Sequence, residues 1–253
     1  MSAEAANIRP GHSGDDARTL VERAYQRLRQ DIIDGVHAPD VKLRVEHLKD
    51  RYGVGAGTLR EALALVVSDA LVIVHPQRGY RVAPISLLDF QDLTNVRVLV
   101  ETEALRQSIR KGNDAWESEV VAAFHRLSRA EERLVSDPVG TAGEWESRNR
   151  LFHEKLIEAC ESRWLRHFAA LLYQQAERYR RLILLKPAIP RNVHKEHTAI
   201  FEATMSRDAE KASRLLAEHI LFSLKEMQAL LTTRKEPPPK PVRSPRRSSS
   251  GSA

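Results

Sequence analysis

The spacing of apolar residues changes from that of strands to that of helices near residue 84, and this change constrains the fold more than any other feature. From Ser86 to about Thr232, apolar side chains recur at helical spacing, interrupted by short polar stretches that contain Gly, Pro or Asp. Before them, "LVIVHPQRGYRV" is rich in β-branched residues and predicts two strands, about 71–75 and 79–83, joined by a turn. We therefore expect a mainly α fold, in which a small unit with a β-hairpin precedes an antiparallel, all-helical bundle.

These patterns divide the chain into four segments. Residues 1–16 are polar, and we expect them to be disordered. The hairpin-containing unit spans 17–84, the bundle spans 85–232, and 233–253 form a tail rich in Pro, Ser and Arg that we also expect to be disordered. The predicted helices of the first unit run from Arg18 to a break at Gly35, over 44–52 and over 56–69. Those of the bundle cover about 86–111, 114–136, 142–160, 162–184, 189–206 and 208–231.

Charge and cysteine content narrow the class of protein. The net charge of +6 lies mostly in the tail, so the folded part is nearly neutral, and non-specific contact between tail and nucleic acid stays an open alternative to a solvated end. The chain has no run of 18 apolar residues, and "MSAEAANIRP" lacks the pattern of a signal peptide. The single cysteine, Cys160, cannot form an internal disulfide. We expect a cytoplasmic protein without a membrane partner.

The stretch "GVGAGTLREALALV" (53–66) places three glycines directly before a predicted helix. A phosphate-binding loop would follow a strand, whereas the preceding "RVEHLKDRY" is helical, and the spacing of the glycines fits no phosphate-binding motif. The stretch instead predicts the turn of a helix-turn-helix, with the hairpin as a wing. Thr58 and Glu61 fit a capping box, which leaves open whether the helix begins near Gly55 or at Thr58.

Several motifs in one order resemble a known family. Over residues 25–84, the chain resembles the winged helix-turn-helix of the GntR family of bacterial transcription regulators, through "LKDRYGV" before the turn, "LREAL" after it and "RGYRV" in the wing. The following bundle resembles the FadR-type subgroup, whose C-terminal ligand domain (the FCD domain) is helical, and six helices indicate its VanR-like branch. The resemblance implies a homodimer that binds a palindromic operator in double-stranded DNA.

The resemblance also implies which residues contact DNA. The family usually carries Ser-Arg-Thr-Pro after the turn valine, whereas this chain has "GAGT", so the first arginine of the recognition helix is absent. The arginine of "LREAL", Arg60, is retained, and a guanidinium can bind guanine O6 and N7. For each candidate, a solvated surface residue is the alternative. The expected DNA-contacting residues are Arg44, Lys49, Arg51, Thr58, Arg60, Gln77, Arg78 and Gly79.

Ten histidines raise the question of a metal site, although their spacing alone does not unite any set of them. Metal-binding FadR-type domains carry Asp-x-x-x-His on one helix and a single histidine on each of two later helices. Matched to this chain, the pattern implies that Asn149, His153, His197 and His219 hold a divalent metal. Three imidazoles suit zinc or nickel. Asparagine in place of aspartate removes a negative charge, so we expect weaker metal affinity.

A metal with open coordination positions can capture the carboxylate of a small metabolite. Arg97 and Glu101 on the first bundle helix, and Arg178 and Tyr179 further along, are candidates for contact with this effector. Their alternatives are an i, i+4 ion pair for the first two and packing for the others. Repression that a small carboxylate relieves is the family's commonest arrangement, and we adopt it as the hypothesis for this chain.

Two other classes of protein remain as alternatives. A metal-dependent enzyme could use the three histidines with Glu154 or Glu196 as general base. No H-E-x-x-H pattern occurs, however, and an enzyme has no need of a turn, "LREAL" and a wing in series. A structural DNA-binding protein would use the basic tail and bind all sequences with similar affinity. We therefore expect a regulator and not an enzyme.

Overall fold

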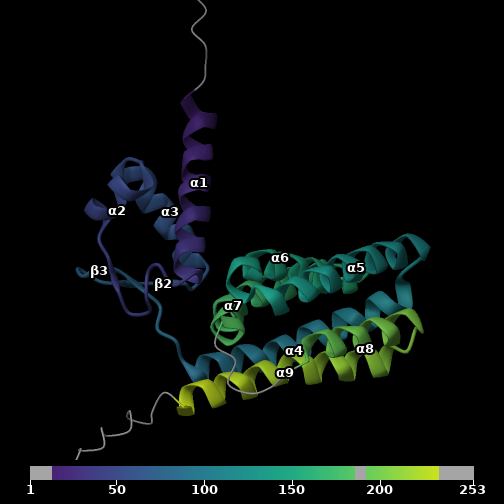
Figure 1. Cartoon of the computed structure of the whole chain (residues 1–253). Coiled ribbons are helices and arrows are strands. Elements are labelled where there is room, and N and C mark those ends of the chain that lie inside the picture. Colours follow the sequence, from purple (N-terminus) through teal and green to yellow (C-terminus); the bar gives the residue numbers. More distant parts are fainter. Residues whose placement is uncertain (1–12, 186–191, 234–253) are drawn as a thin grey trace, which may run out of the picture.

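The computed structural model describes residues 13–185 and 192–233. They form a head (13–82), a short linker (83–86) and a helical bundle (from 87 on) (Figure 1). In the head, Leu28, Leu59 and Leu63 are fully buried between the helices and the sheet. The sheet is antiparallel in the order β1-β3-β2, with Leu43 opposite Tyr80. The elements of the head are α1 (Ser13–Ile33), β1 (Lys42–Leu43), α2 (Val45–Tyr52), α3 (Ala56–Ser68), β2 (Val72–His75) and β3 (Gly79–Val82).

The glycine-rich stretch is the turn between α2 and α3. Gly53 ends α2 in the left-handed conformation (φ 64°), and its N–H donates to the carbonyl of Lys49. The N-cap of α3 is Gly55, so the helix begins at the earlier of the two possible positions and Thr58 lies in its first turn. These two glycines therefore set the angle at which α3 leaves α2.

The bundle has two layers of helices (Figure 1). α4 and α9 run side by side with α8 next to them, and α5 and α6 form the other layer, with α7 between the head and the bundle. The core includes Leu105, Leu127, Phe152, Ile200 and Leu216, which are almost completely buried. No helix in the described ranges is long and apolar enough to cross a membrane. The elements are α4 (Leu87–Lys111), α5 (Asp114–Ser136), α6 (Pro138–Leu156), α7 (Arg163–Leu185), α8 (Val193–Met205) and α9 (Ala209–Thr233).

Several boundaries differ from the sequence-based expectations. α1 begins at Ser13, so residues 13–16, which were expected to be disordered, are helical. α6 begins at Pro138 because the Asp137 side chain caps the helix, accepting from the N–H of Gly140, and proline fits the first turn. α6 also ends at Leu156, four residues earlier than expected. The short strand β1 was not predicted, because it depends on pairing with β3.

Some expectations concern parts of the chain that lie outside the described residues. These are the disorder of residues 1–12, the start of the fifth bundle helix at 189–191 and the disorder or DNA contact of the tail 234–253.

We expect Gly53→Ala to lower the free energy of unfolding by about 1 kcal/mol, because a positive φ strains a residue that carries a Cβ. Gly57→Ala is the matched control, since this glycine lies in α3 with open space around the added Cβ and no positive φ. It should leave the stability unchanged or raise it. Urea unfolding followed by circular dichroism measures both, and an equal loss in the two variants would contradict the role of Gly53 as the C-cap.

Candidate functional site

The outer side of α3 carries the arginine that was expected to read bases. Leu59, Ala62 and Leu63 are completely buried against the head, whereas Arg60 is exposed and Thr58 is half-buried. The buried face therefore fixes the orientation of α3 and leaves the Arg60 guanidinium at the surface.

The basic residues of α2 differ in their local partners. Lys49 Nζ lies 2.7 Å from Glu46 Oε2, and Arg51 Nε lies 3.4 Å from Asp31 Oδ2. Arg44 is exposed at the N-cap of α2. All three side chains are at least partly accessible, and exposed ion pairs of this kind are weak enough to exchange for phosphate contacts.

The wing adds basic residues that the sequence did not single out. Gln77 (φ 59°) and Gly79 (φ 83°) form the tight turn between β2 and β3. The strands next to it line a hollow of about 320 Å³. Arg81 was missed although it follows "RGY" on β3, and Lys42 could not be found because its strand β1 forms only by pairing with β3. The residues that line the hollow are Lys42, His75, Arg78, Tyr80 and Arg81.

α7 joins the head to the bundle through buried polar contacts. Arg29 of α1 donates from Nη2 to Glu177 Oε2 at 2.9 Å, and its Nε lies 3.7 Å from Asp69. Both Arg29 and Glu177 are buried, and they are 148 residues apart in the sequence. A second ion pair joins Arg181 Nη2 of α7 to Oδ1 of Asp34, the residue that follows α1, at 2.8 Å.

Two of the expected effector contacts lie at the linker. Arg178 donates from Nη1 to the carbonyl of Ala83 and from Nη2 to that of Pro84, at 3.1 and 3.0 Å. The Tyr179 hydroxyl donates to Asp89 at the start of α4, and its ring stacks on Phe90. Neither residue lines the two cavities described below. Arg178 and Tyr179 therefore hold the linker between head and bundle, and their contact with an effector stays a prediction.

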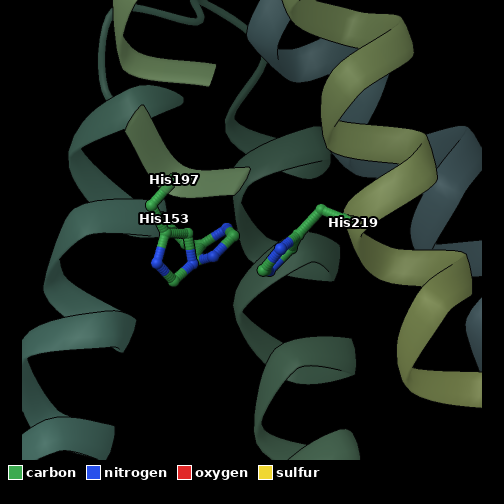
Figure 2. A group of neighbouring side chains, drawn as sticks. All are labelled: His153, His197 and His219. Carbon is green, nitrogen blue, oxygen red and sulfur yellow. The ribbon is translucent and has the colours of Figure 1, made fainter. Parts of the chain in front are cut away.

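Three histidines from three helices converge inside the bundle (Figure 2). His153 of α6, His197 of α8 and His219 of α9 each offer one ring nitrogen, and these three atoms lie within 4.8 Å of one another. The first two side chains are buried and the third is nearly so. Such a cluster matches the donor set of a metal bound by three imidazoles.

Two glutamates orient the rings. His197 Nδ1 donates to Glu131 Oε1 at 2.6 Å, and His219 Nδ1 donates to Glu196 Oε2 at 2.8 Å. Metal-binding histidines usually donate their second ring nitrogen to a carboxylate in this way. The sequence did not single out Glu131, whose contact spans 66 residues, and it offered Glu196 only as a catalytic base.

The unpaired buried atoms of Asn149 and of the histidine cluster fit a bound cation. Within the described ranges, His153 Nε2, His197 Nε2 and Asn149 Oδ1 are buried without a hydrogen-bond partner. The amide of Asn149 donates from Nδ2 to the Tyr173 hydroxyl at 2.7 Å, which holds Oδ1 as the unpaired atom. Buried unpaired acceptors cost free energy, and a metal ion would satisfy them.

The environment keeps His153 neutral. Burial, together with the nearby imidazoles of His219 and His197, lowers the pKa of His153 well below its ordinary value. Burial also raises the pKa of Tyr173 well above its ordinary value, so its hydroxyl stays protonated. A neutral imidazole is the form that binds a metal.

Two cavities flank the histidine cluster. The larger one measures about 500 Å³ and is lined in part by Asn149 and His219. The smaller one measures about 210 Å³ and is lined by Glu101, His153 and Tyr173, among others. The cluster is therefore accessible to a small ligand from the cavity on either side.

The expected pair Arg97 and Glu101 is buried beside the smaller cavity. Arg97 Nε donates to Glu101 Oε1 at 2.8 Å, and both side chains are at most 5% exposed. The guanidinium also lies over the Tyr173 ring, 5.5 Å from its centroid. A second buried ion pair lies next to the larger cavity, where Arg180 Nη2 is 2.5 Å from Glu146 Oε1. The guanidinium groups of these two buried pairs are therefore already paired with carboxylates, and Arg166 adds a further cation to the lining of the smaller cavity.

The chain matches two family models. Residues 20–82 match the model described as bacterial regulatory proteins, gntR family, and residues 92–222 match the FCD domain.

Similar proteins agree with this result. The chain is 47% identical over 209 residues to the HTH-type transcriptional regulator BphR of Paraburkholderia xenovorans (strain LB400), covering 83% of this chain and 85% of that protein. It is 35% identical over 208 residues to the HTH-type transcriptional repressor GlaR of Escherichia coli (strain K12), covering 81% and 94%. The solved structure of E. coli McbR/YncC shares the fold, with a TM-score of 0.68 at 17% identity over 84% of this chain and 98% of that one. This chain therefore belongs to the GntR family of DNA-binding transcription regulators, in the subgroup that carries an FCD domain, and it is not an enzyme.

Proposed function

We propose that this protein is a homodimeric repressor that binds a palindromic operator and releases it when a small carboxylate binds in a metal-containing FCD domain. The observation that carries this proposal is the buried cluster of His153, His197 and His219, with unpaired acceptor atoms next to a cavity. The relative GlaR is a transcriptional repressor, and this likeness supports repression over activation. Because its partner is DNA, we propose a cytoplasmic location.

His153, His197 and His219 would hold the metal, with Asn149 Oδ1 as a possible fourth ligand. Three imidazoles favour zinc or nickel over magnesium or calcium, which prefer oxygen ligands. The bound ion would supply positive charge and open coordination positions for a carboxylate oxygen. Glu131 and Glu196 would orient the rings, and Arg97 would add positive potential beside the smaller cavity.

On DNA, α3 would enter the major groove with Arg60 as the main base-reading side chain. Gly55 and Gly57 carry no side chains, so the start of α3 could approach the groove closely. Arg78 and the other basic residues of the wing, Lys42 and Arg81 included, would contact phosphates or the minor groove. Arg44, Lys49 and Arg51 would contact the backbone from α2.

The dimer would form through an apolar face made of exposed side chains from α4 and α7, two helices that pack against each other. Large apolar side chains lie on the outer sides of both helices, and Leu99 is 71% and Trp164 57% exposed. Exposed apolar area of this kind is typical of an interface. A monomer in sedimentation velocity at micromolar concentration would contradict this assignment. The face comprises Leu88, Val96, Leu99, Trp164, Phe168 and Leu171.

α7 would transmit the effector signal. Its Tyr173 and Arg180 lie beside the histidine cluster and the larger cavity, and its Glu177 pairs with Arg29 of the head. An effector changes DNA affinity only as far as it prefers one arrangement of the heads over another. A small shift of α7 would change that arrangement through the pair between Glu177 and Arg29.

The DNA contacts predict two different losses of binding. Arg60→Ala should cost about 1–3 kcal/mol on a selected operator and relax the preference at one base pair. Lys42→Ala should weaken binding to all sequences alike and reduce the slope of log K against log salt by about 1. Selection from random DNA followed by anisotropy titrations at several salt concentrations measures both. Unchanged specificity in Arg60→Ala would show that another residue reads the bases.

The metal site predicts one divalent ion per chain, measured by elemental mass spectrometry on untagged protein purified without chelators. His197→Ala should lose the ion because it removes one of three imidazole ligands. Glu131→Gln keeps all three ligands but removes the carboxylate that orients His197, so its metal affinity should fall about 10- to 100-fold. Absence of metal from the wild-type protein after incubation with zinc or nickel would refute the metal site.

The proposed response to an effector predicts that one acid both binds the protein and causes it to release DNA. In calorimetry with metal-loaded protein, at least one of acetate, succinate and octanoate should bind, and it should weaken operator binding about fivefold or more. His197→Ala should bind none of them. If none of these acids binds the loaded protein, the result would count against a carboxylate effector.

Glu177→Gln tests the path from the effector to the head. It removes the charge that holds Arg29 to α7 but leaves Arg29 next to Asp69 in the head. The acid should still bind, whereas its effect on operator affinity should fall below about twofold. Glu132→Gln, in an exposed ion pair on α5, is the matched control and should respond like wild type. A full response in Glu177→Gln would place the coupling elsewhere.

A further inference from the structure

The larger cavity has more apolar wall than the binding of a carboxylate group alone would need. Its volume of about 500 Å³ lies within the range of sites for drug-sized ligands. Polar and charged residues line part of it, Asn149, His219 and Arg180 among them, and apolar side chains from α5, α6, α7 and α8 line another part. These are Leu134, Val135, Trp145, Ile183, Leu184 and Val193.

One hydrogen-bond donor in this apolar wall has no partner. Trp145 is 5% exposed, and its indole Nε1 makes no hydrogen bond in the part of the chain that the structure describes. Trp116, by contrast, donates from Nε1 to the carbonyl of Lys155 at 2.8 Å. Buried indole N–H groups usually have such a partner, and an unpaired one costs free energy. Trp145 lines the cavity, and its N–H is a donor that the described residues leave unpaired.

The position of Trp145 limits where that ligand carries its acceptor. Trp145, Asn149 and His153 follow one another at four-residue spacing, which places them on one face of α6. Eight residues of helix rise about 12 Å. An acid whose carboxylate lies at the histidine end of the cavity therefore needs several bonds between its carboxylate and the atom that meets the indole.

We propose that the effector is a carboxylic acid with an apolar body and a second hydrogen-bond acceptor at its far end, and that Trp145 Nε1 donates to this acceptor. The inference rests on the proposed function, because it assumes that the histidine end holds the carboxylate. The apolar wall binds the body of the acid, and Trp145 distinguishes an acid with the distal acceptor from one without it. A site with a buried donor rejects analogues that leave the donor unpaired.

Calorimetric titrations of the metal-loaded, full-length protein with three acids test the carboxylate, the apolar body and the distal acceptor one at a time. Succinate offers carboxylates without an apolar body, octanoate adds the body, and 7-oxooctanoate adds a distal ketone. We expect octanoate to bind at least about tenfold more tightly than succinate, because each buried methylene adds affinity. In Trp145→Phe, which keeps an aromatic wall, the affinity of 7-oxooctanoate relative to octanoate should fall about 2- to 10-fold.

A measurement on the wild-type protein covers the case in which Trp145→Phe does not fold. With ¹⁵N-labelled tryptophan, 7-oxooctanoate should shift the indole N–H resonance of Trp145 downfield, whereas octanoate should not. The resonance of Trp116, already hydrogen-bonded, is the internal control.

The outcomes distinguish this inference from the proposed function. Tight succinate binding with no gain for octanoate would overturn the inference and leave a carboxylate effector intact. The same holds if the ketone changes neither the relative affinity nor the indole resonance. Failure of all three acids to bind would count against the proposed function itself.

Discussion

The buried polar contacts of α7 are the constraint on which the rest of the structure depends. Charged groups leave water only when they are paired, and α7 buries Glu177 against Arg29 of the head and Arg180 against Glu146 of α6. Breaking either pair would strand a buried charge, so the partners must stay in register. One helix therefore fixes the position of the head and one wall of the larger cavity together.

The histidine cluster depends on the same low-polarity interior. Burial keeps His153 neutral, and Glu131 holds His197 in one ring orientation. The cluster keeps buried acceptor atoms that residues 13–185 and 192–233 leave unpaired. Such atoms persist where a ligand, and not the fold, satisfies them. Neighbouring side chains thus hold the rings of the site in place, whereas acceptor atoms at its centre are left for a ligand to satisfy.

Much of the fold follows from local patterns, and the departures have local causes. The periodicity of apolar residues located every helix of the bundle, because amphipathic helices bury one face. It misjudged the start of α6, where "SDPVG" looked like a break although Asp137 and Pro138 favour the beginning of a helix. It missed β1, whose two residues have no pattern of their own and form a strand by pairing with β3.

The sequence by itself determined the order of helices and strands, the glycine-rich turn and the family, because these depend on neighbours along the chain. Through the family, it also selected His153, His197 and His219, which the tertiary structure brings together. The tertiary structure alone decided that Glu131 orients His197, that Arg178 holds the linker and that the Trp145 indole has no partner among the described residues. Each of these contacts, or the lack of one, depends on which helices pack together, and no spacing within a single helix encodes that choice.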